Sequence, residues 1–377
     1  LTRSEQFPTV DITASGSRTD PSGNSFPGNI VDDFADNYRL SGDVFWELDF
    51  FGRLRRSTEA ARGELLAAEE SRRSVTISLI ANVASTYMLL RDLDAQLEIA
   101  RRTEATRTDS LGIIQARFDK GTVPLVDVNQ AEIELAVAIA AVATAERAVV
   151  QTENSLSILL GRNPGPIVRG VALDQQSLPP DVPVGLPSEL LQRRPDVLAS
   201  EASLAAQTAR IGVAEALRWP SISLTGSLGV ESQDLSELFD DGSDFWSVGG
   251  NIFAPLINSG AGRARVDAEI ARTEQALLSY EQTVQRAFAE VEDALVAVRT
   301  YKSEHEARSL QVTAARSAAF LSRARYDGGV TSYLEVLDSE RSLFSAELSE
   351  SQTLRLYINS IIELYKALGG GWVPKEP

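Results

Sequence analysis

Two pairs of short segments alternate apolar and polar residues, and each pair precedes a much longer segment with helical periodicity. The first pair lies around residues 10–14 and 40–50, and the second lies around 221–230 and 246–254. Alternation with a period of two predicts strands that have one apolar and one polar face. Four strands cannot close a barrel alone, since about eight is the practical minimum. The strands therefore form either a small sandwich or a barrel shared by several chains.

The longer segments predict two very long helices. Residues from about 54 to 118 contain no proline and only two glycines, which predicts a helix of about 100 Å. The matching stretch, from about 263 to 326, carries an apolar seam whose steps alternate four and three residues. The seam consists of Val266, Ile270, Thr273, Leu277, Tyr280, Val284, Ala287, Val291, Ala294, Val298 and Tyr301. A sustained heptad seam predicts left-handed supercoiling against partner helices, although the pattern is interrupted around His305 and Arg308.

A shorter helix is expected to return after each long one, over residues 124–160 and 332–368, because glycines stand at both intervening turns. The two halves also resemble each other at a spacing of about 210 residues. For example, Arg117-Phe118-Asp119 is echoed by Arg325-Tyr326-Asp327. Self-similarity at a constant spacing indicates a duplicated architecture. The sequence therefore predicts a mainly helical α+β fold in two repeats, each with a strand pair and a helical hairpin.

These patterns divide the chain into seven parts. They are a first strand pair (1–53), a first helical hairpin (54–161), an irregular connector (162–187), a helix leading to the second copy (188–218), a second strand pair (219–262), a second helical hairpin (263–369) and a tail (370–377). The connector is placed by its high content of proline and glycine, which favours irregular backbone.

Composition excludes several classes of function. The chain has no cysteine and a single histidine, His305, so thiolate chemistry and histidine-based metal or catalytic clusters have almost no ligands available. The net charge of −17 argues against a nucleic-acid partner, since phosphate binding needs clustered Lys and Arg. No cofactor and no metal site is expected. No apolar run approaches about 18 residues, so a membrane role would have to use the strands.

Several motifs occur in a fixed order along nearly the whole chain. They are Trp46-Glu47-Leu48-Asp49-Phe50-Phe51-Gly52-Arg53, Leu190-Leu191-Gln192-Arg193-Arg194-Pro195-Asp196-Val197, Trp219-Pro220, and Tyr326-Asp327-Gly328-Gly329-Val330 with Tyr333-Leu334 and Leu337-Asp338. With these motifs the chain resembles the TolC-like outer-membrane factors, in the branch of the multidrug-efflux outer-membrane lipoproteins. The resemblance implies a bacterial outer-membrane protein whose tunnel extends into the periplasm.

The same resemblance implies an assembly and partners. Three identical chains would contribute four strands each to a twelve-stranded outer-membrane barrel in contact with lipid, and their helices would continue it as the tunnel. The channel would be a passive exit duct rather than an enzyme, and it would receive substrates from a periplasmic adaptor protein and an inner-membrane pump of the RND type. It would open by an iris-like shift of the hairpins at the periplasmic tip.

Four residues near the second tip are the candidate gate. Leu334, Asp338 and Arg341 fall at i, i+4 and i+7 and therefore share one helix face, so a trimer could direct three carboxylates inward. The resemblance places a constriction at Leu334 and Asp338, with Arg341 and Tyr326 tying the closed state together. The simpler alternative is a solvated Asp338–Arg341 pair worth about 0.2–0.5 kcal/mol. The gate is favoured because the first repeat has uncharged counterparts, which are Val126, Gln130 and Ile133.

The hairpin tips are a second candidate site. They consist of Gly121, Thr122, Val123 and Pro124 in the first repeat and Gly329, Val330 and Thr331 in the second. The glycines make the turns, and the small apolar residues beside them are candidates for contact with the adaptor.

Aromatic residues also gather near the strand ends: Trp46, Phe50, Phe51, Trp219, Phe245, Trp246 and Phe253. They fit either a membrane-interface belt or packing between strand and helix, and for Phe51 and Trp219 we expect packing.

Alternatives to a multidrug duct remain at this point. One is the outer-membrane duct of a type I secretion or heavy-metal efflux system, and another is a coiled-coil scaffold without a lumen, which the alternating strands disfavour. One departure from the family pattern stands out. A helix precedes Trp219-Pro220, but only six residues precede Phe7-Pro8, where the family has a matching helix and a lipid-bearing cysteine. We therefore expect an N-terminally truncated piece or a variant in which this helix and the cysteine are missing.

Overall fold

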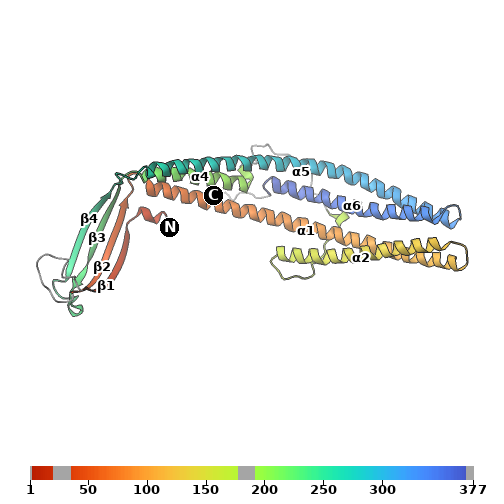
Figure 1. Ribbon diagram of the computed structural model, residues 1–377, viewed down its shortest axis with the longest axis horizontal. Helices are drawn as coiled ribbons and strands as arrows, with labels where there is room; N and C mark the ends of the chain where they lie inside the picture. Colours follow the sequence, from red (N-terminus) through yellow and green to blue (C-terminus); the bar gives the residue numbers. More distant parts are fainter. Residues whose placement is uncertain (1, 20–34, 177–191, 371–377) are drawn as a thin grey trace. The chain divides into compact units, whose positions relative to one another are not determined.

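The computed structural model describes residues 2–19, 35–176 and 192–370, and these residues form two compact units. The first unit comprises residues 1–70 and 199–282, and the second comprises 71–198 and 283–377. Figure 1 shows the order of the elements along the chain. The predicted connector (from residue 177), the start of the helix predicted from 188, Leu190-Leu191 and most of the tail lie outside the described residues.

The first unit contains a four-stranded antiparallel sheet in the order β1-β2-β3-β4. The strands are β1 (Thr9–Thr19), β2 (Ala35–Leu48), β3 (Ser221–Ser232) and β4 (Asp244–Phe253). All four lie in one sheet, so the sandwich alternative is wrong. β2 ends at Leu48, before Phe50, which the alternation had predicted as part of the strand.

Register explains why the alternation was so regular. Val10 pairs with Val44, which pairs with Gly226, which pairs with Val248, and the next row of the same face contains Ile12, Leu228 and Trp246. One face of the sheet is therefore apolar along these rows, because alternate residues of a strand point to the same side. These large side chains are exposed in a single chain. The opposite face is polar, with Asp43 accepting hydrogen bonds from Ser41 and Ser227.

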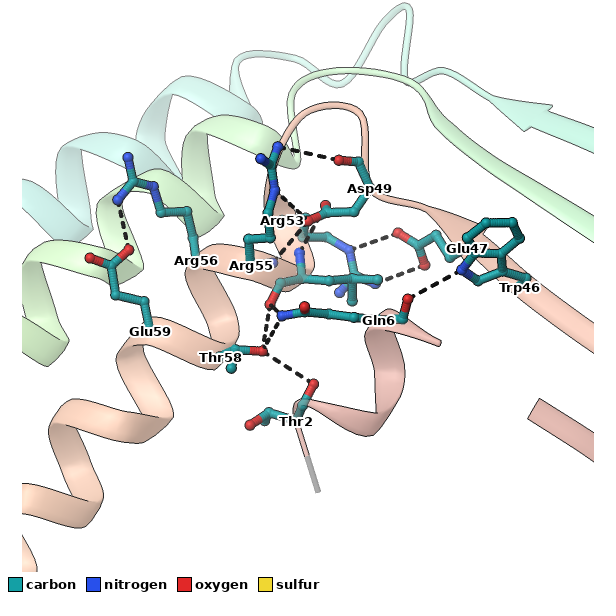
Figure 2. A network of polar contacts seen from close by, with 11 residues as sticks. Thr2, Gln6, Trp46, Glu47, Asp49, Arg53, Arg55, Arg56, Thr58 and Glu59 are labelled. Atoms are coloured by element: carbon teal, nitrogen blue, oxygen red, sulfur yellow. Dashed lines mark hydrogen bonds and ion pairs between the residues drawn. The ribbon is translucent and has the colours of Figure 1, made fainter. Parts of the chain in front are cut away.

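The junction between β2 and the first long helix is closed by polar contacts (Figure 2). The Asp49 carboxylate accepts hydrogen bonds from the amides of Leu54 (3.0 Å) and Arg55 (2.9 Å), so it caps the N-terminus of the helix. Arg53 donates two hydrogen bonds to Glu47, at 3.0 and 2.7 Å. A short 3-10 turn, η1 (Ser4–Gln6), contacts the same junction through Gln6. Asp49 therefore supplies the acid that the first turn of the helix itself lacks.

Both repeats contain helices of equal length. α1 (Arg53–Asp119) and α5 (Ala261–Asp327) have 67 residues each, and α2 (Leu125–Leu159) and α6 (Tyr333–Ala367) have 35 each. Each end lies 208 residues from its counterpart, as the starts at 53 and 261 and at 125 and 333 show. The predicted helices agree with these bounds within two residues, and the predicted two-repeat fold is confirmed.

The turns between long and short helices have the same conformation in both repeats. Gly121 and Gly329 have φ angles of 71° and 73°, a left-handed conformation that costs glycine little. In the first turn the amide of Thr122 donates to Arg117, and in the second the amide of Val330 donates to Arg325. This six-to-one hydrogen bond is the Schellman arrangement that ends helices at glycine.

Between the repeats, α4 (Pro195–Ala216) leads into β3. It begins at Pro195, after a break at Arg194 that follows helical backbone at Gln192 and Arg193. A proline favours such a break, because it disfavours helical backbone at the preceding residue and is tolerated in the first turn. Two further 3-10 turns are η2 (Leu173–Gln175) and η3 (Leu235–Glu237).

The heptad seam of α5 is buried in the second unit at Ala287, Val291 and Ala294. Where the seam is interrupted, His305 lines a cavity of about 680 Å³ together with residues of α1, α6 and η2. The described helices include none that is long and apolar enough to cross a membrane.

Candidate gate at the hairpin tips

The core of the second unit near the tips joins the two hairpins. Its buried members are Ile114, Val128, Ala131, Tyr326, Tyr333, Val336 and Leu337, with Leu111, Phe118 and Val123 packed around them. The rings of Tyr326 and Tyr333 lie 5.4 Å apart, and the Arg117 guanidinium lies 4.8 Å from the Tyr326 ring centroid. Tyr326, one of the predicted gate residues, is thus buried between the hairpins. Its hydroxyl has no hydrogen-bond partner among the described residues.

Arg341, the second predicted gate residue, contacts the first hairpin through a buried acid. Its guanidinium donates to the Glu134 carboxylate on α2, which also accepts from Arg107 on α1. The Arg107 and Glu134 side chains are 5% and 6% exposed, whereas Arg341 is 50% exposed. Two arginines from different helices therefore converge on one carboxylate. Such a shared acid links α6 to both helices of the first hairpin.

Leu334 and Asp338 share their face of α6 with Arg341 but differ from it in their contacts. Both are exposed, Leu334 to 56%, whereas the intervening Val336 and Leu337 are fully buried. Within the part of the chain that the structure describes, the Asp338 carboxylate has no hydrogen bond or ion pair. The Asp338–Arg341 contact of the simpler alternative is absent, because Arg341 turns to the buried Glu134 instead. Of the four predicted residues, Tyr326 of α5 and Arg341 of α6 therefore contact the first hairpin, whereas Leu334 and Asp338 of α6 are exposed in a single chain.

A second polar layer lies beside the tyrosines. Arg323 donates to the Ser110 hydroxyl at 2.8 Å and lies 3.5 Å from Glu340. Burial raises the pKa of Glu340 above its ordinary value, and the nearby guanidiniums of Arg107 and Arg323 offset this only in part. Burial also raises the pKa of Tyr333 to about 12.

Two further levels of contact lie farther along α6. Glu347 accepts from Arg102 of α1 at 2.5 Å and from Arg316 of α5 at 3.0 Å. The buried Asp92 of α1 accepts from Ser351 at 2.5 Å and from Arg355 at 2.9 Å. Sequence reasoning missed these acids, because a single Asp or Glu among many on a long helix carries no periodic signal. Successive turns of α6 are therefore attached to the first hairpin by ion pairs.

The tip residues differ between the repeats. Val330 is exposed, whereas Val123 packs against the core of the tips. Thr122 donates to the carbonyl of Arg117 at 2.8 Å, and Thr331 donates to Glu335. Both threonine hydroxyls therefore form hydrogen bonds with residues of the helices next to their turns. The exposed apolar side chain of the second tip is Val330. Contact between the tips and an adaptor stays a prediction.

Arg194, in the Arg-Arg-Pro-Asp motif, holds the far end of α6. Its guanidinium donates to the Ala367 carbonyl at 3.0 Å, to both Asp196 oxygens and to Glu290 at 2.7 Å. Burial would raise the pKa of Asp196, but the hydrogen bonds and charge of Arg194 outweigh it, so the pKa is lowered. This part of the motif therefore attaches α4 to the end of the second hairpin.

In the first unit, Phe51 and Trp219 stack with their centroids 5.5 Å apart and their planes at 10°. We expected these rings to pack where strand meets helix; they stack on each other, and both remain exposed in a single chain.

Solved structures share this architecture. The open-state structure of the MtrE outer membrane channel of Neisseria gonorrhoeae matches 98% of this chain and 82% of its own, with a TM-score of 0.87 and 34% identity. A crystal structure of a membrane protein from Pseudomonas aeruginosa matches 98% of this chain and 83% of its own, with a TM-score of 0.90 and 34% identity. Four antiparallel strands and two helical repeats are thus the fold of an outer-membrane channel.

Sequence comparison identifies the family. The chain is 40% identical over 379 residues to the solvent efflux pump outer membrane protein SrpC of Pseudomonas putida, covering 99% of this chain and 79% of that protein. A family model described as outer membrane efflux protein matches residues 1–162 and 186–370, and the chain belongs to that family. It is an outer-membrane channel component of an efflux pump, with a tunnel in the periplasm. Members of the family are channel proteins that work with an adaptor and an inner-membrane pump.

Proposed function

We propose that this chain forms a homotrimeric exit duct that receives substrates from a periplasmic adaptor and an RND-type pump and conducts them passively to the cell exterior. The sheet supports this assembly. β1 and β4 are its edges, and neither has a second neighbour among the described strands. Unpaired edges next to an exposed apolar face favour pairing with another copy. Three copies would supply twelve strands, enough to close a barrel around an aqueous pore.

The gate is assigned to the second hairpin near its tip. Leu334 and Asp338 project from α6 away from the core of their own chain. In a three-fold arrangement the same face of each copy meets at the axis, so Leu334 forms an apolar constriction and Asp338 a ring of three carboxylates. Such a ring prefers cations. The single observation that carries this assignment is the exposure of both residues beside a fully buried Val336 and Leu337.

The closed state is held by contacts between the two hairpins of one chain. Arg341 binds Glu134, and Tyr326 packs in the shared core. An iris-like movement of the second hairpin away from the first must separate these groups, together with Arg102 and Glu347. Contact of the adaptor and pump with the tips, at Val330 above all, would offset the loss of these ion pairs. The gate is then a balance between contacts within the chain and contacts with its partners.

Planar-bilayer conductance of an Asp338→Ala variant tests the gate. Removing three carboxylates from the constriction should raise single-channel conductance about twofold or more and weaken cation preference. Gln130 occupies the matching position of the first repeat, so Gln130→Ala is the control and should conduct like the wild type. Light scattering on the same samples establishes the trimer. A trimeric Asp338→Ala variant with unchanged conductance and selectivity would remove Asp338 from the gate.

A further inference from the structure

The turn between β4 and α5 in the first unit carries two large apolar side chains that the chain itself leaves uncovered. Leu256 and Ile257 are 90% and 93% exposed. They follow Ile252, which shares the apolar face of the sheet with Val248 and is also exposed. Exposed apolar side chains therefore continue along the chain from the end of the strand to the start of the helix.

Arginines surround the same turn. Arg263 lies in the first turn of α5 and Arg265 just after it, and Arg218 lies directly before Trp219. A Cβ atom at Gly262 would lie 3.3 Å from the Arg218 Cγ atom, so the Arg218 side chain lies against the beginning of α5. None of the three guanidiniums has a hydrogen bond or ion pair among the described residues. All three side chains are exposed, so in a chain with a net charge of −17 they form a local group of cations that is accessible to an external anion.

The first repeat shows what the second lacks. Arg55 is the counterpart of Arg263, and its guanidinium lies 3.3 Å from the Asp49 carboxylate (Figure 2). The residue 208 positions after Asp49 is Ile257. The first repeat therefore neutralises its arginine with its own acid, whereas the second places an exposed apolar side chain there and leaves Arg263 unpaired.

We propose that Arg218, Leu256, Ile257 and Arg263, here called the β4–α5 surface, bind the headgroups of outer-membrane phospholipids. The guanidiniums contact the headgroup phosphate, and the apolar pair enters the adjoining acyl region. Arginine suits this partner because its planar fork donates two parallel hydrogen bonds to phosphate oxygens. Charge complementarity and continuity with the apolar sheet face favour lipid over other partners. The stacked Phe51 and Trp219 near the same strand ends are typical of a membrane interface.

The test is thermal unfolding of the full chain in an uncharged detergent, titrated with dihexanoyl-phosphatidylglycerol. The lipid should stabilise the wild type, and an Arg218→Gln/Arg263→Gln variant should bind it about tenfold more weakly, as expected for the loss of charge-assisted hydrogen bonds. Arg55→Gln is the matched control and should keep wild-type affinity. The Ile257→Asp variant should bind the lipid more weakly to a similar extent, because the new carboxylate would pair with Arg263 as Asp49 pairs with Arg55.

Four results would overturn the proposal. They are equal lipid affinity in the wild type and the double variant, an equal loss in Arg55→Gln, binding of inorganic phosphate as tight as that of the lipid, and loss of the oligomer in the double variant without lipid. The third result would indicate a site for a soluble anion. The fourth would assign the arginines to contact between copies, and light scattering at each stage detects it.

Discussion

The two hairpins have the same lengths but different chemistry. Their long helices have 67 residues each, their short helices have 35 each, and both turns use the same glycine conformation. Yet Glu134 of the first hairpin corresponds to Ser342 of the second, and Arg341 corresponds to Ile133. The residues that pair across the hairpins have counterparts of different charge in the other repeat, as the pair of Arg341 and Glu134 shows. Divergence between the halves therefore creates the contacts that hold them together.

Glu134 tests this comparison most severely. A Glu134→Gln variant leaves Arg107 buried without its counter-charge and should cost about 3 kcal/mol of unfolding free energy. Thermal unfolding followed by circular dichroism in detergent measures it. The matched variant, Ser342→Ala, changes an exposed position with no polar contact and should stay within about 0.5 kcal/mol. Similar midpoints for the two variants would show that the Glu134 contacts contribute nothing to holding the hairpins together.

The far end of the second hairpin comes next. An Arg194→Ala variant removes the donor that the Ala367 carbonyl and Asp196 share, and should cost about 2 kcal/mol. The loss should appear as a lower unfolding midpoint. Lys366→Ala removes only an exposed pair with Glu363 near the same helix end and should be close to neutral. An Arg194→Ala variant as stable as Lys366→Ala would contradict the role assigned to the motif.

Glu340 gives the smallest effect, a pH dependence. Its pKa is raised by burial in the folded state, so the folded state binds this proton more tightly than the unfolded state does. The Glu340 contribution to stability is therefore greatest below its unfolded pKa and is lost as pH rises through its folded pKa. A Glu340→Gln variant removes that dependence, so wild-type stability should fall relative to the variant as pH rises above about 4.3, the ordinary pKa of glutamate.

Unfolding midpoints of both proteins across this range provide the measurement. Glu132→Gln at the matching exposed position should track the wild type at every pH. If the difference in unfolding midpoint between wild type and Glu340→Gln stays constant across this pH range, folding does not raise the pKa of Glu340.

The fold could be predicted from local patterns, because alternation, heptad steps and turn glycines are properties of neighbouring residues. The seam through Ala287 and Val291 is buried as its period required. The partner of Arg341 could not be predicted in this way, because Glu134 lies 207 residues away and stands among other acids of the same helix. A local rule proposed Asp338, three residues away. Arg341 pairs with Glu134 rather than with Asp338 because Glu134 is buried, and water screens the attraction between opposite charges less at a buried carboxylate than at an exposed one.

The exposed residues behave differently. Helix spacing and a family resemblance indicate Leu334 and Asp338, and both are exposed in a single chain. Their place at the constriction stays a prediction. The contrast between Asp49 and Ile257 was also present in the sequence. The sequence alone did not show that this contrast affects an arginine. The structure shows it, because Asp49 contacts the start of α1 and Arg55.

Equal helix lengths also restrict how such a protein can evolve. Arg341, Glu347 and Arg355 each meet a partner in the other repeat at a different height, so the two halves are matched along several turns. A seven-residue insertion in α6 alone would preserve the heptad pattern and yet carry the residues beyond it about 10 Å along the axis. Each of those arginines and acids would then face the wrong neighbour. A change of tunnel length therefore requires matching insertions or deletions in both halves of the gene. The depth of the duct is for this reason expected to change rarely during evolution.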